Sequence, residues 1–213
     1  MRCPMHNDHE KIQQYWTQFS GELNLEHPQV EELYSLLENA YTEPQRHYHT
    51  IQHIAECLDL FYQIKAQLND PIAVELAIWF HDVIYDPKAP DNEEQSAILM
   101  HKYCGNLLAS DQIQKVYDWI IATKKHQASI DQGLNTLLDI DLAILGSSTV
   151  RFAEYEQQIQ QEYAWVEAQV YKIKRAEVLQ YFYQMQPIYQ TQYFRQRFED
   201  QAKQNLLEMM TKK

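Results

Sequence analysis

The chain has 213 residues and a net charge of −12, from 18 lysines and arginines against 30 aspartates and glutamates. This length predicts a single domain over residues 1–213, and a hydrophobic content of 45% is enough for a folded core. Only four glycines are present, where average usage predicts about fifteen. This scarcity argues against a glycine-rich phosphate loop, a dinucleotide-binding fingerprint and a turn-dense β fold. We therefore expect an all-α protein.

The acidic charge argues against a nucleic-acid polymer as partner, because such binding needs a basic surface that releases counterions. A small anionic substrate remains compatible with it, since a pocket can be locally positive. The three cysteines, Cys3, Cys57 and Cys104, are far apart and odd in number, which is typical of reduced thiols. The chain begins without an apolar signal segment and has no run long enough to span a bilayer. We expect a soluble cytoplasmic protein without a membrane partner, and a homo-oligomer is left open.

Apolar residues recur every three or four positions through most of the chain, which predicts helices. Asp70 and Pro71 predict the start of a nearly all-apolar helix from Ile72 to about Tyr85. This helix should be central, because a helix that is apolar all round must be covered on every side. Three amphipathic stripes are expected before it: Ile12 to Leu23, Val30 to Ala40 after Pro28, and Ile54 to Ile64.

The second half of the chain is also predicted to be helical, with capping residues that indicate the helix limits. The segment DPKAPDNEE reads as a loop because it holds two prolines and several cap-forming residues. One helix is expected to start at Asp91, with Glu94 in its first turn, and to end at Gly105, and the next is expected to start at Ser110 or Asp111. Another is expected to start at Ser129 with Gln132 and to continue through Leu134 to Leu145 until Gly146 ends it. The last helical stretch is expected from Val150 to about Met210, with one break at Pro187.

Three segments concentrate residues that can bind metals or transfer protons. They are RHYHTIQHI over 46–54, the doublet His81-Asp82 in AIWFHDVIYD, and Asp139 with Asp141 in LLDIDLAIL. On a helix, His49 and His53 would share one face. An ionised carboxylate in apolar sequence is costly unless it is paired or bound to a cation. Each residue alone is compatible with an ordinary hydrogen bond or salt bridge, but together they favour one divalent ion, of Mn, Mg, Fe, Ni, Co or Zn.

In these residues the sequence resembles the HD-domain superfamily of metal-dependent phosphohydrolases, and more closely a poorly characterised bacterial branch of predicted HD phosphohydrolases. The resemblance rests on His53, on His81-Asp82 placed 28 residues later, and on a distant Asp-Leu pair, together with the segments DNEEQSA and IIATKKH. It covers residues 46–146 and follows 149–211 more loosely. It implies a helical domain around a buried metal site, whose core is about 46–146.

The resemblance also implies roles for individual residues. His53, His81, Asp82 and Asp141 would bind the metal, with Asp139 competing with Asp141 for the last place. His49 would be the general acid, because YHTIQHI is similar to the YHNxxHA motif of cyclic-nucleotide phosphodiesterases. A second metal would need an additional ligand, for which His126 and His101 are candidates, although His101 lies in an ordinary amphipathic stretch and is interpreted as a surface residue.

The implied activity is hydrolysis of a small phosphoester, plausibly a nucleotide, by metal-activated water, with Asp82 or Asp141 orienting that water. Arg46 and Lys124 are the expected cations near phosphate, and Glu93 is expected near the bound substrate. Two alternatives stay open. One is a non-catalytic nucleotide-binding or sensor protein that keeps the metal pocket, and the other is a di-iron oxygenase on the same fold.

Overall fold

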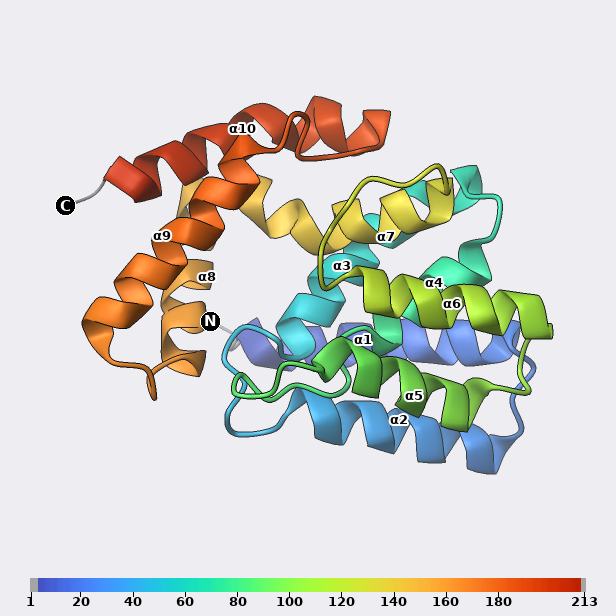
Figure 1. The fold of residues 1–213 in the computed structure, drawn as a ribbon. Helices are drawn as coiled ribbons and strands as arrows, with labels where there is room; N and C mark the ends of the chain where they lie inside the picture. The colour runs from blue at the N-terminus through green and yellow to red at the C-terminus, as the bar shows by residue number, and fades with distance from the viewer. Residues whose placement is uncertain (1–3, 212–213) are drawn as a thin grey trace. The chain divides into compact units, whose positions relative to one another are not determined.

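The structure is a computed structural model that describes residues 4–211, and these residues form ten α-helices and two short 3-10 helices with no strand (Figure 1). The all-α prediction is therefore confirmed. The chain divides into two compact units, one that ends at Gln127 and one that begins at Ala128. In the described residues, no helix combines the length and the apolar character that a bilayer-spanning segment requires.

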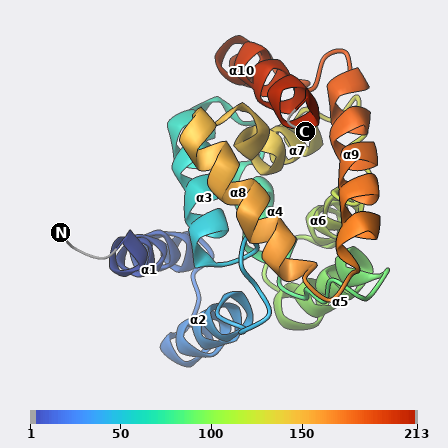
Figure 2. The ribbon, with the colours of Figure 1, turned by 90° about the vertical axis from the view of Figure 1, so that its left-hand side faces the viewer.

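The first unit is organised around a central buried helix, α4. Every residue of α4 from Ala73 to Phe80 is buried, and the helix packs against α1, α3, α5 and α6. Figure 2 shows α1 and α3, which also contact one another, side by side. The elements of this unit are α1 (Pro4–Glu22), α2 (His27–Tyr41), α3 (Ile51–Ile64), η1 (Lys65–Gln67), α4 (Pro71–Phe80), α5 (Asn92–Cys104) and α6 (Ser110–Ala122).

Helix α4 begins as predicted but ends earlier. The Asp70 carboxylate accepts a hydrogen bond from the Ala73 amide at 3.4 Å, and Pro71 occupies the first turn. The helix was expected to reach about Tyr85, yet it ends at Phe80. Side chains from other segments bind the backbone after it: Arg46 donates to the carbonyl oxygens of Asp82 and Val83, and Ser96 accepts from the Ile84 amide. These contacts satisfy backbone groups that a longer helix would have paired internally.

Two other helices begin near their predicted positions, but their capping differs from the prediction. Helix α5 begins after Asp91 as predicted, but the Asp91 side chain makes no capping hydrogen bond. Helix α7 (Gln132–Asp141) is capped by Asp131, which accepts hydrogen bonds from the amides of Gly133 and Leu134, and not by Ser129. Ser129 instead accepts a hydrogen bond from the Asp131 amide. The predicted capping box was wrong here because the aspartate lies directly before the first helical residue.

The second unit is built around the short helix η2, which packs against α7, α8 and α10. Two side chains hold its backbone: Tyr189 donates to the Leu142 carbonyl oxygen, and Asn205 donates to the carbonyl oxygens of Leu145 and Ser147. A Cβ atom on Gly146 would lie 2.6 Å from the Cβ of Phe198, so this approach requires glycine. The elements are α7 (Gln132–Asp141), η2 (Leu142–Gly146), α8 (Thr149–Glu162), α9 (Ala168–Gln184) and α10 (Gln192–Thr211).

The last third of the chain contains one break more than the sequence predicts. The break at Pro187 is present between α9 and α10, but α8 also ends at Glu162 and α9 begins at Ala168. Glu167 caps α9 by accepting hydrogen bonds from the amides of Gln169 and Val170. The cap provides a local reason for a new helix to start where the apolar pattern alone continues.

Candidate metal centre

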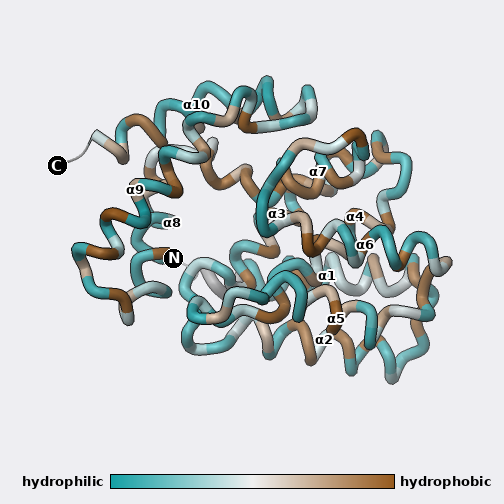
Figure 3. The backbone as a smooth tube through the Cα atoms, viewed as in Figure 1, coloured by the Kyte–Doolittle hydropathy of each residue, from teal (hydrophilic) through white to brown (hydrophobic). Residues whose placement is uncertain are grey.

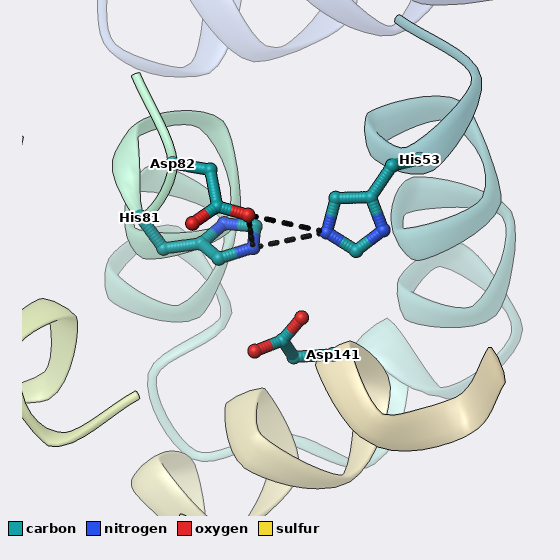
Figure 4. A group of neighbouring side chains, drawn as sticks. All are labelled: His53, His81, Asp82 and Asp141. Atoms are coloured by element: carbon teal, nitrogen blue, oxygen red, sulfur yellow. Dashed lines mark hydrogen bonds and ion pairs between the residues drawn. The ribbon is translucent and has the colours of Figure 1, made fainter. Parts of the chain in front are cut away.

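Two buried imidazoles from different helices face each other in the first unit. His53 is the third residue of α3 and is 2% exposed, while His81 directly follows α4 and is 1% exposed. Their Nε2 atoms lie 3.2 Å apart. Asp82 Oδ2 lies 3.5 Å from His53 Nε2 and 3.2 Å from His81 Nε2. Figure 4 shows the three side chains converging on one point from α3 and from the end of α4.

The hydrogen bonding of His81 shows which of its ring nitrogens is available. His81 Nδ1 lies 2.8 Å from the carbonyl oxygen of Ile78, one turn earlier in the chain. A carbonyl can only accept, so Nδ1 carries a proton and Nε2 is the ring nitrogen directed at the cluster, where it presents a lone pair whenever the ring is neutral. Metal-binding histidines are commonly oriented by such a bond from the second nitrogen to a backbone carbonyl.

His53 has two further neighbours besides the residues of the cluster, a cysteine and a tyrosine. Cys57, a buried free cysteine one turn further along α3, places its Sγ 3.7 Å from Nδ1 and 3.8 Å from Nε2. The ring of Tyr48 lies with its centroid 4.8 Å from that of His53.

Asp82 is ionised in this arrangement. Burial raises the pKa of its carboxyl group, but the charges of His81 and His49 and hydrogen bonds from His53 and His81 outweigh burial and hold the pKa well below its usual value. The carboxylate is therefore in the protonation state that a divalent cation requires. His53, His81 and Asp82 together form a cluster that could bind a metal ion.

The two candidate aspartates of the second unit differ in their surroundings. Asp139 is 1% exposed, and its two carboxylate oxygens accept hydrogen bonds from the amides of Gln190 and Thr191, both at 2.7 Å. Burial raises the pKa of Asp139 to about 6, against the lowering effect of those two bonds. Asp141 is the last residue of α7 and is half-buried. Both oxygens of Asp139 are thus used within its own unit, and Asp141 is the fourth side chain labelled in Figure 4.

His49 does not lie on the helix that carries His53. Helix α3 begins at Ile51 after the N-cap Thr50, whose backbone is extended, so the expectation of a shared helical face was wrong. The two rings are nevertheless near one another, with centroids 5.9 Å apart. The His49 ring stacks on Tyr85 at a centroid distance of 4.1 Å. No local sequence pattern indicates this pairing of His49 with Tyr85.

Arg46 is engaged by protein oxygens and is not an open cation. Its side chain is fully buried. It donates to the carboxylate of Glu43 and to the carbonyl oxygens of His49, Asp82 and Val83, at distances of 2.6 to 3.2 Å. Its guanidinium therefore positions the backbone on both sides of the cluster. This arrangement does not support the substrate contact that the sequence predicted for it.

The remaining predicted residues of the first unit lie in other surroundings. Lys124 forms ion pairs with Glu93 at 3.5 Å and Glu94 at 2.8 Å, which link the end of α6 to the start of α5. His126 follows α6 with a backbone φ of 49°, and the group of potential metal ligands within the described residues does not include it. Cys104 is a buried free thiol, and Cys3 lies outside the described residues.

None of the family models, curated proteins or solved structures with which the chain was compared matches it.

Proposed function

We propose that the protein is a metal-dependent phosphohydrolase of the HD-domain type, which binds a divalent ion through His53, His81 and Asp82. Asp141 remains the further ligand that the sequence resemblance implies. The activity is hydrolysis of a small phosphoester, for which a nucleotide is the leading candidate. The observation that carries this proposal is the close approach of three donor atoms from two buried histidines and an ionised aspartate.

The spacing of these donor atoms fits one ion. Two nitrogens that each lie about 2.1 Å from a metal, at a ligand–metal–ligand angle of about 100°, are about 3.2 Å apart. The observed separation of the two Nε2 atoms is 3.2 Å, and Oδ2 of Asp82 lies at 3.2 and 3.5 Å from them. The donor set of imidazole and carboxylate without thiolate suits Mn, Fe, Ni, Co or Zn, and Mg if water completes its shell.

When bound, such an ion supplies hydroxide from water at neutral pH and neutralises the phosphoryl oxygens. The chain's own residues would orient the reactants and move protons. The His49 ring, held by its stack on Tyr85 and near His53, would protonate the leaving oxygen, a role typically worth 10²- to 10⁴-fold in rate. Arg46 would act indirectly, because it binds the backbone of both His49 and Asp82.

The proposal is tested by a panel of phosphomonoesters and phosphodiesters, nucleotides included, assayed with each of the six metals. We expect phosphate or alcohol release from the wild-type protein, lost in His53→Ala and in Asp82→Ala together with metal binding. His49→Ala should keep its metal and lose rate. The matched control is His101→Ala, an exposed histidine of α5, which should behave as wild type.

Two outcomes would contradict the proposal. A protein that loads metal through these residues but releases no product across the panel, while binding nucleotides, would be a sensor or binding protein. A protein that holds two irons and consumes oxygen would be an oxygenase, and it would need ligands beyond the cluster described here.

A further inference from the structure

Helix α9 is unusual among the helices of this chain because it buries almost nothing. Of its 17 residues, only Leu179 is buried. A helix of a soluble protein normally packs an apolar stripe about 100° wide or more against the rest of the fold. The side of α9 opposite Leu179 is therefore the side on which a binding partner could pack.

Apolar residues gather on this exposed side. Val170 is 47% exposed, Ile173 52%, Val178 40% and Tyr181 48%. At 3.6 residues per turn these four positions fall within an arc of about 140° centred roughly opposite Leu179. Figure 3 shows that brown, hydrophobic stretches alternate with teal, hydrophilic ones along α9. Lys174 and Glu177 lie within the same arc and form an ion pair at 2.9 Å. We call these six residues the α9 stripe.

The order of residues in the α9 stripe is complementary to itself. If two copies of α9 pack antiparallel about a twofold axis between Arg175 and Ala176, each position meets its mirror position on the other copy. Val170 then meets Tyr181, Ile173 meets Val178, and Lys174 meets Glu177. Apolar residues face apolar residues and the basic residue faces the acidic one at every step.

A parallel arrangement does not have this property. It would place Lys174 against Lys174 and Glu177 against Glu177, which is repulsive. A lipid surface is also disfavoured as the occupant, because anionic membranes attract basic proteins and this chain carries a net charge of −12. We propose that the protein forms a twofold homodimer in which the α9 stripes of two copies pack antiparallel.

The test begins with the mass of the full-length protein by sedimentation and light scattering over a range of concentrations. We expect a species of twice 25.4 kDa with a dissociation constant in about the micromolar range, given the small stripe. Ile173→Glu should give the monomer. The control Gln169→Glu adds the same charge to an exposed position of α9 outside the stripe and should remain dimeric.

A charge exchange makes the test independent of folding. Lys174→Glu and Glu177→Lys should each be monomeric alone, because like charges then face each other. An equimolar mixture of the two should form a heterodimer, since opposite charges meet again at both positions. Circular dichroism of each variant checks that the helices are retained. A wild-type protein that stays monomeric at about 100 µM, or variants that all remain dimeric, would overturn the proposal.

Discussion

Nη1 of Arg46 donates a hydrogen bond to the backbone carbonyl oxygen of Asp82 at 2.6 Å, so a buried guanidinium holds the turn that carries a candidate metal ligand. The same side chain binds the carbonyl oxygens of Val83 and His49. The precision of the cluster therefore depends on a residue that itself contributes no ligand atom. This relationship explains why α4 can end at Phe80 without leaving the following carbonyl groups unpaired.

Replacing this guanidinium should weaken both the fold and metal binding. Arg46→Met keeps the apolar stem but leaves three carbonyl oxygens and Glu43 without their donors. We expect a loss of about 3 kcal/mol in the free energy of unfolding, measured by urea denaturation with chelator present. The neighbouring exposed Gln45→Ala should change it by less than about 0.5 kcal/mol. Equal stability of Arg46→Met and wild type would show that the carbonyl contacts are dispensable.

The two aspartates near the end of α7 should separate into a structural and a metal-binding residue. Asp139→Ala removes the acceptor of the Gln190 and Thr191 amides and should destabilise the protein by about 2–3 kcal/mol while leaving its metal affinity largely intact. Asp141→Ala should do the opposite and lose metal affinity with little change in stability without metal. Thermal unfolding without metal and calorimetric metal titration measure the two effects. The reverse pattern would assign the ligand to Asp139.

Two glycines should respond in opposite directions to alanine. At Gly146 the added Cβ would lie 2.6 Å from both the Cβ and the carbonyl oxygen of Phe198, so Gly146→Ala should destabilise the protein by about 2–4 kcal/mol. At Gly21, within α1, nothing lies within 4 Å of the new atom. Gly21→Ala should stabilise by about 0.5–1 kcal/mol, because alanine favours the helix and restricts the unfolded chain. Urea unfolding of both variants measures the two effects, and the result for Gly146→Ala tests the packing of α10 on η2.

Glu75 should give the stability a pH dependence of definite sign. Its side chain is fully buried in α4 and accepts hydrogen bonds from Tyr62 at 2.7 Å and Lys65 at 2.9 Å. Burial raises its pKa above 4.5, although those partners lower it. Glu75 loses its proton at a lower pH in the unfolded state, near 4.5, than in the folded state. The free energy of unfolding therefore falls as the pH rises from 4.5 through the raised pKa.

Glu75→Gln removes this titration, so it provides the comparison. The stability of the wild type relative to Glu75→Gln should be greatest below pH 4.5 and should decrease as the pH rises through the raised pKa. Urea midpoints of the two proteins at several pH values, with chelator present, give the difference. A difference that grows as pH rises would mean that the pKa of Glu75 is lowered in the folded state.

The sequence predicted the cluster better than it predicted the helix limits. His53, His81 and Asp82 could be recognised because polar residues in strongly apolar helices require a common partner. The buried environment of Arg46 could not be predicted, because it depends on backbone carbonyls 36 and 37 residues away, which no local pattern records. The break between Glu162 and Ala168 was missed for a related reason, since an apolar pattern can continue through a turn that a single cap residue such as Glu167 creates.

The most direct test of the central claim is the metal content of purified protein, measured by elemental analysis after incubation with Mn, Fe, Ni, Co and Zn in turn and removal of unbound ions. Bound ions should be present at about one per wild-type chain and should be nearly absent from His81→Ala, which removes a nitrogen whose lone pair is aimed at the cluster. Equal metal content in the two proteins, or none in the wild type with any of the five metals, would contradict a metal centre at these residues.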